Sequence, residues 1–64
     1  MTLDEIKASV AFGLRVWWKS NIYRVIKDDI GQWLIKCTIN DYCIGLTWVD
    51  GVTMNGKPED FYIE

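Results

Sequence analysis

The sequence predicts a mainly β protein: a small antiparallel barrel of about five short strands, preceded by a short N-terminal helix. Two observations support this prediction. Along residues 32–48, large apolar side chains alternate with mostly small or polar ones, so that the large apolar side chains fall on one face of a hairpin. Turn-forming residues also recur at short intervals, at 20–21, 28–31, 50–51 and 55–56. With 64 residues, the chain forms a single domain over residues 1–64.

The central hairpin is expected to turn at Asn40-Asp41, because both residue types tolerate the positive φ of a two-residue type I′ turn. Directly opposed residues share a face, so this turn places eight large side chains on one face. The expected pairs are Ile39 with Tyr42, Cys37 with Ile44, Ile35 with Leu46, and Trp33 with Trp48.

The N-terminal residues carry a helix signature. Thr2-Leu3-Asp4-Glu5 fits a capping box, in which Thr2 and Glu5 satisfy each other's backbone N–H groups. Leu3, Ile6 and Val10 then recur at helical spacing. We predict a helix over about residues 3–11, ended by Gly13.

The next segment predicts a second hairpin, with strands over residues 14–19 and 22–27 and a turn at Ser20-Asn21. Its expected pairs are Trp18 with Tyr23, Val16 with Val25, and Trp17 with Arg24. The face opposite the predicted core mixes basic and apolar side chains. Its members are Arg15, Trp17, Lys19, Ile22, Arg24 and Ile26.

The C-terminal segment predicts one helical turn that begins at Pro58, followed by a last strand, Phe61-Tyr62-Ile63. A last strand after one helical turn favours an SH3-like barrel over an OB-like one. The main alternative is a flat sheet whose helix covers Trp17, Ile22 and Ile26. The expected core consists of Trp18, Tyr23, Val25, Trp33, Ile35, Ile44, Leu46 and Trp48.

The composition argues against an enzyme. The sequence contains no His to act as a base near neutral pH. Cys37 is expected to face the core. Cys43 is expected to face the other way, and no charged residue near it would lower the pKa of its thiol. Two thiols on opposite faces cannot form a disulfide, which indicates a reducing compartment. The first residues are acidic rather than basic, and no apolar run could span a membrane, so we expect a cytoplasmic protein.

No cofactor is expected either. Asp50, Asn55 and Asp60 carry oxygen ligands of the kind that Ca²⁺ prefers, but their spacing matches no known loop of that kind. Asp50 and Asn55 each precede a glycine, and turns explain this pattern better than a metal-binding loop does. We therefore predict no metal site and no small-molecule cofactor.

Several short segments of residues 14–63 resemble a family of very short, largely uncharacterised proteins from bacteriophages and prophages. The resembling residues are Gly45-Leu46-Thr47-Trp48, Asp50-Gly51-Val52-Thr53, Asn55-Gly56 and Glu59-Asp60-Phe61, together with Val16-Trp17-Trp18-Lys19 and Tyr23-Arg24-Val25. The resemblance implies a phage or prophage origin and action inside a bacterial cell. It carries no functional residue over to this chain.

The candidate site is a binding face made of Arg15, Trp17, Lys19, Ile22 and Arg24. Trp and Arg dominate the energetics of protein interfaces, so we expect a protein partner, either a second copy of the chain or a host protein. The alternative is single-stranded nucleic acid, which binds where aromatic rings lie beside cations. Against that alternative, the isoelectric point is near 4.9, whereas nucleic-acid modules are usually basic.

Overall fold

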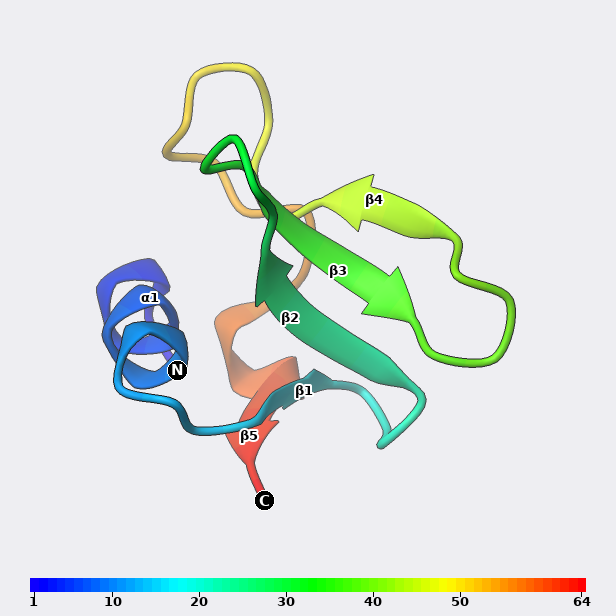
Figure 1. The fold of residues 1–64 in the computed structure, drawn as a ribbon. Helices are drawn as coiled ribbons and strands as arrows, with labels where there is room; N and C mark the ends of the chain where they lie inside the picture. Colours follow the sequence, from blue (N-terminus) through cyan, green and yellow to red (C-terminus); the bar gives the residue numbers. More distant parts are fainter.

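The computed structural model describes residues 1–64 as one open antiparallel sheet of five strands, with a single α-helix packed against it (Figure 1). The elements are α1 (Leu3–Ala11), β1 (Val16–Trp18), β2 (Tyr23–Lys27), β3 (Trp33–Cys37), β4 (Cys43–Gly45), the 3-10 turn η1 (Pro58–Asp60) and β5 (Phe61–Ile63). The strand order is β4-β3-β2-β1-β5. The mainly β class is therefore confirmed. The sheet does not close into a barrel, because β4 and β5 form its two opposite edges.

The helix α1 begins as the sequence predicts. The Thr2 N–H donates to Glu5 Oε1 at 2.8 Å, and the Glu5 N–H donates to Thr2 Oγ1 at 3.2 Å. These bonds to Thr2 lower the pKa of the Glu5 carboxyl. The helix ends before Gly13, whose φ of +97° few other residues adopt without strain. No helix of the structure has both the length and the apolar character that crossing a membrane requires.

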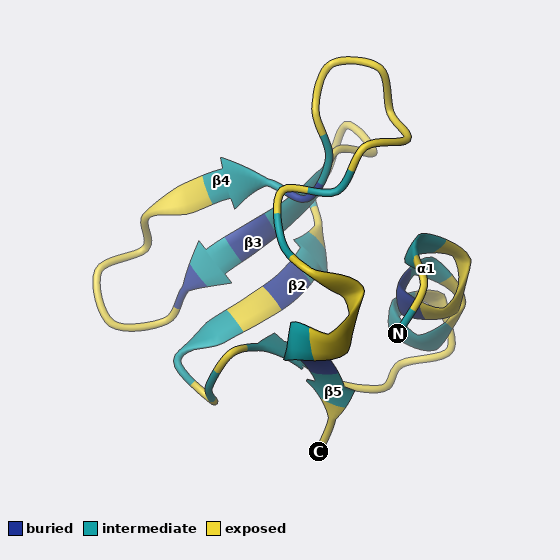
Figure 2. Ribbon diagram, turned by 180° about the vertical axis from the view of Figure 1, so that it is seen from behind, coloured by how far each residue is buried: buried dark blue, intermediate teal, exposed yellow.

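The helix covers the face of the sheet that carries Val16 and Val25, which we call the inner face (Figures 1 and 2). Ile6 is fully buried there, in one cluster with both valines and Ile35. The alternative of an open sheet with the helix on one face is therefore right about the sheet but wrong about the face, because the helix does not cover Trp17. Side chains alternate along a strand, so Trp17 lies on the opposite face, which we call the outer face.

The β1–β2 hairpin forms in the predicted register, with Trp17 opposite Arg24. The strand β1 ends at Trp18, because Lys19 adopts a φ of +65° and turns the chain. The Ser20 N–H donates to the Trp18 carbonyl at 2.7 Å around Lys19, and the Tyr23 N–H donates to the Ser20 carbonyl at 3.3 Å around Asn21-Ile22. The predicted pairing is therefore confirmed, whereas the connection is longer than the predicted two-residue turn at Ser20-Asn21.

The β3–β4 hairpin forms in a register two residues away from the predicted one. Ile35 lies opposite Ile44, where the sequence predicts Leu46. The connecting loop is longer than two residues: the Asp41 N–H donates to the Cys37 carbonyl, and only Asp41 has a positive φ, of +61°. A shift by two residues leaves every side chain on its predicted face, because the side-chain period of a strand is two.

The Leu46 N–H still donates to the Trp33 carbonyl at 3.0 Å, and after Leu46 the chain leaves β3 and folds back on itself. The Trp48 N–H donates to the Thr53 carbonyl at 2.8 Å, and Thr47 forms an isolated bridge with Met54. Trp48 is 62% exposed as a result, so its predicted pairing with Trp33 in the core is wrong. The two residues nearest the predicted hairpin turn, Ile39 and Tyr42, are exposed as well.

The core is small and lies between the inner face, α1 and the C-terminal segment (Figure 2). Its buried cluster consists of Ile6, Val16, Val25, Ile35, Leu46 and Phe61. Four of the predicted core residues, Trp18, Tyr23, Trp33 and Ile44, are only half-buried against it. Both cysteines are free thiols, with Cys37 buried and Cys43 exposed.

Replacing Trp48 with alanine is expected to change the free energy of unfolding by less than about 0.5 kcal/mol, because exposed side chains contribute little to stability. The matched variant is Trp33→Ala. Trp33 packs against the core, and the ammonium groups of Lys7 and Lys27 lie 5.8 and 5.5 Å from its ring centroid. Urea unfolding of the two variants should give clearly different midpoints; equal midpoints would contradict the position of Trp48.

Candidate functional site

The outer face carries one continuous row of side chains across all five strands. In order from β5 to β4, the row is Tyr62, Trp17, Arg24, Lys36 and Cys43, each directly opposite the next on the neighbouring strand. Opposed residues share a face and have Cβ atoms about 4.5–5.5 Å apart. The row therefore places two aromatic rings beside two cations on an open sheet surface.

The charge of the outer face differs from that of the whole chain. The net charge is −2, yet the five strands contain no Asp or Glu. The only ion pair joins Lys36 Nζ to Asp41 Oδ1 at 3.2 Å. Arg15 and Arg24 are both exposed and have no carboxylate partner. The strands therefore contribute only positive charge to the outer face, and the acidic groups nearest to it are Asp41 at Lys36 and Glu64 in the hollow beside Arg15.

The structure brings three of the five predicted site residues together, Arg15, Trp17 and Arg24, and places Ile22 in the turn before β2. Trp17 and Arg24 are cross-strand neighbours, and Arg15 and Trp17 line a shallow hollow of about 180 Å³ with Asn21 and Glu64. Ile22 precedes β2, and its carbonyl accepts the N–H of Thr38 at 2.8 Å, which holds the start of the strand against β3.

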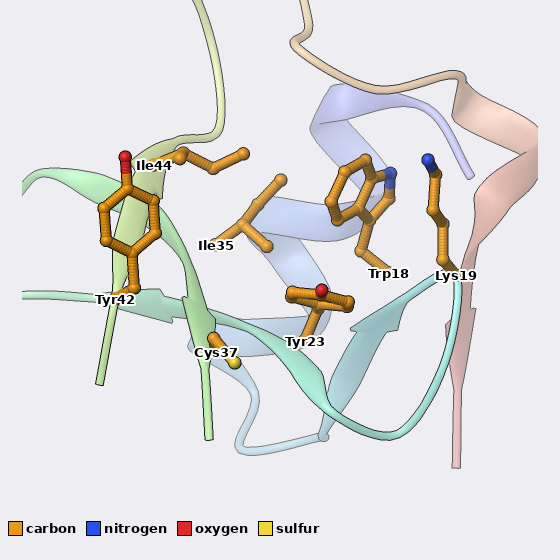
Figure 3. A pocket seen from close by; sticks show the side chains of 7 residues that line it. All are labelled: Trp18, Lys19, Tyr23, Ile35, Cys37, Tyr42 and Ile44. Carbon is orange, nitrogen blue, oxygen red and sulfur yellow. The ribbon is translucent and has the colours of Figure 1, made fainter. Parts of the chain in front are cut away.

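The placement of Lys19 on the outer face is wrong. Its positive φ breaks the alternation of the strand, and its ammonium lies 4.6 Å from the ring centroid of Trp18, a contact of cation–π type. Trp18 belongs to the inner face, so Lys19 reaches that side of the sheet (Figure 3). Trp17 makes no such contact with Arg24; the other cations over an aromatic ring are Lys7 and Lys27, at Trp33.

Two outer-face residues were not part of the predicted site. Lys36 joins Arg24 only because β3 pairs with β2, and Tyr62 joins Trp17 only because β5 returns to β1. Alternation alone assigns Lys36 to the face opposite Ile35. No local signal pairs β5 with β1, because their residues lie far apart in the sequence.

A second surface lies on the inner face, where neither α1 nor the C-terminal segment covers the sheet. It is a pocket of about 270 Å³ lined by Trp18, Lys19, Tyr23, Ile35, Cys37, Tyr42 and Ile44, which we call the aromatic pocket. Figure 3 shows Tyr42 and Ile44 on one side, Trp18 and Tyr23 on the other, and Ile35 between them. The rings of Trp18 and Tyr23 meet edge-to-face, 5.5 Å apart.

The wall of this pocket depends on the segment before η1. Gly56 lies against the indole of Trp18 so closely that a Cβ atom there would overlap Nε1. The Asn55 side chain donates to the Gly45 carbonyl at 2.7 Å and fixes the segment to the end of β4. The predicted Asn55-Gly56 turn signal therefore has a second role, because it positions Trp18.

Comparisons with protein-family models, curated proteins and solved structures gave no match. No group of three or more His, Cys, Asp or Glu side chains is arranged to hold a metal ion. The function must therefore be argued from the two surfaces themselves.

Proposed function

We propose that this chain is a non-enzymatic binding protein whose outer face docks a protein partner with an acidic surface. The observation that carries this proposal is the row of Tyr62, Trp17, Arg24 and Lys36 across the sheet. Tyr, Trp and Arg are the residue types that contribute most to protein interfaces. The guanidinium of Arg24 has no carboxylate partner within the chain, which leaves it free to bind one on another protein.

The size of the outer face suits a modest interface. Adjacent strands lie about 4.8 Å apart, so a row across five strands extends about 20 Å. The neighbouring row of Ile26, Leu34 and Gly45 adds apolar surface beside the charges. In such an interface the apolar centre supplies most of the affinity, and the charged residues around it orient the partner.

The resemblance to short phage and prophage proteins supports a partner in the bacterial cytoplasm. The partner of the outer face is then a host protein that the small domain engages.

Single-stranded nucleic acid is the second candidate ligand. Trp17 and Tyr62 are cross-strand neighbours on an open sheet, an arrangement on which two successive bases can stack. Arg15, Arg24 and Lys36 would then contact phosphates. The acidic isoelectric point, near 4.9, favours the protein partner.

The test is affinity capture from a bacterial lysate with the wild type and with Trp17→Ala/Arg24→Ala. The matched control is Phe12→Ala/Lys57→Ala, which also removes one aromatic ring and one cation, both exposed and both away from the outer face. We expect the wild type and the control to retain the same partner and the Trp17/Arg24 variant to lose it. Circular dichroism of all three proteins verifies that they are folded.

A labelled thymidine oligonucleotide separates the two ligands. If the outer face neutralises three phosphates, nucleic-acid affinity should fall about 20-fold between 50 and 200 mM salt, because counterions are released on binding. An apolar protein interface should weaken much less. If the Trp17/Arg24 variant keeps every partner and the same affinity for the oligonucleotide, the outer face is only solvated surface.

A further inference from the structure

The aromatic pocket has the chemistry of a site for an apolar side chain that lies beside a carboxylate. Six of its seven lining residues are hydrophobic. The remaining one, Lys19, has no carboxylate partner in the chain. At about 270 Å³ the pocket is smaller than sites for drug-sized ligands, which are about 300–1,000 Å³, and suits one bulky side chain of a protein.

The same chain exposes a segment with this chemistry. We call residues 48–53 the Trp48 loop. Trp48 is 62% exposed, Val52 is 73% exposed, and Val49 is fully exposed. All three are close in sequence to the carboxylate of Asp50, so the loop offers large exposed apolar side chains beside one anion.

The loop is held in a defined shape by Asp50. Its Oδ1 accepts the N–H groups of Val52 and Thr53, both at 2.9 Å, and its Oδ2 accepts the Thr53 hydroxyl at 2.6 Å. The bonds from Thr53 and Val52 also lower the pKa of the Asp50 carboxyl, so it is ionised at neutral pH. A carboxylate has about four acceptor sites, so Oδ2 can still accept a bond from an ammonium group.

The Trp48 loop and the aromatic pocket lie at opposite ends of the strands (Figures 1 and 2). The pocket is formed at the start of β2 and the end of β3, around Tyr23 and Cys37. The loop follows β4 and projects at the other end, beside the β2–β3 turn. The loop of one molecule cannot reach its own pocket, so the two surfaces can meet only between molecules.

We propose that the Trp48 loop of one copy inserts into the aromatic pocket of a second copy, with apolar side chains against Trp18 and Tyr23 and the Asp50 carboxylate facing Lys19. Charge and polarity match on both sides: the pocket offers rings and one cation, and the loop offers apolar side chains and one anion. Such a contact uses two different surfaces, so it is head-to-tail and generates chains or rings.

The test measures the mass of the full chain by sedimentation velocity over a wide range of concentrations. We expect the wild type to associate as the concentration rises, with weak affinity because one loop in one pocket buries little surface. Trp48→Ala removes the inserted group and Lys19→Glu reverses the charge of the pocket, so each variant alone should stay monomeric. Lys19→Gln serves as a milder second variant.

Mixing the two variants gives the decisive observation. The Trp48→Ala protein retains an intact pocket and the Lys19→Glu protein retains an intact loop, so the mixture should form one-to-one dimers and nothing larger. The matched control, Phe12→Ala, also removes an exposed ring and should associate like the wild type.

Three outcomes would overturn the proposal. The wild type stays monomeric at every concentration; either variant associates like the wild type; or the mixture of variants remains monomeric, which would place the self-contact elsewhere. The Trp17→Ala/Arg24→Ala protein distinguishes this contact from the proposed function of the outer face. It should lose the captured partner but associate with itself like the wild type.

Discussion

Replacing Ile35 with alanine is expected to lower the free energy of unfolding by about 2–5 kcal/mol. Ile35 is 1% exposed and lies on β3, between β2 and β4, so its side chain contacts the centre of the core. A small domain has a total stability of only about 5–15 kcal/mol. The variant should therefore be partly unfolded well below the melting temperature of the wild type.

The control for this substitution is Ile39→Ala, which removes the same atoms from a side chain that is 76% exposed. Its effect should stay within about 0.5 kcal/mol. Urea unfolding measures both values, and unchanged slopes would show that only stability differs. If Ile39→Ala cost as much as Ile35→Ala, the hairpin register described above would be incorrect.

Replacing Gly56 with alanine is expected to destabilise the domain by about 1–3 kcal/mol, the usual cost of overpacking. The added Cβ would overlap Nε1 of Trp18 and lie 3.0 Å from its Cε2 atom. Gly56 does not have a positive φ, so backbone strain does not contribute. The substitution acts only by displacing the indole, which also forms one wall of the aromatic pocket.

A double-mutant cycle isolates this contact. In a Trp18→Phe background the smaller ring lacks Nε1, so Gly56→Ala should cost less there than in the wild type. Neighbours in contact typically show interaction energies of about 0.5–3 kcal/mol. Strictly additive effects would mean that Gly56 and Trp18 do not meet, and thermal unfolding of the four proteins gives the required comparison.

Local sequence signals predicted the elements that depend on near neighbours. The bounds of α1 follow from the Thr2–Glu5 capping box and from Gly13. The β1–β2 register follows from the turn signal around Ser20-Asn21, although the turn itself extends from Lys19 to Ile22. In each case the decisive contacts lie within a few residues along the chain, so periodicity and turn chemistry are sufficient to locate them.

The remaining features depend on tertiary contacts or on a single backbone angle. Alternation fixes which face a residue occupies but not which residue it opposes, so the β3–β4 register could be wrong by two while the faces were right. The positive φ of Lys19 moves one predicted site residue to the other face. The apolar pattern that continues to Trp48 gives no sign that the chain leaves the sheet after Leu46.

The aromatic pocket shows that a strand pattern predicts the face of a residue but not its burial. Trp18, Tyr23 and Ile44 have the pattern of core residues, and they do lie on the inner face. Whether an inner face becomes core or pocket depends on what covers it, and a helix of nine residues covers only part of a five-stranded sheet. How much of the inner face the helix covers depends on the assembled fold, so the pattern of residues along a strand cannot predict it.

The openness of the sheet has a consequence for aggregation. Free edges invite other strands to add, and proteins often keep such edges short. Both edges here are three residues long, β4 at Cys43–Gly45 and β5 at Phe61–Ile63. An incoming strand would gain very few backbone hydrogen bonds at either one. The protein therefore remains an unclosed sheet without presenting a template for fibril growth, and a partner has to bind through its side chains.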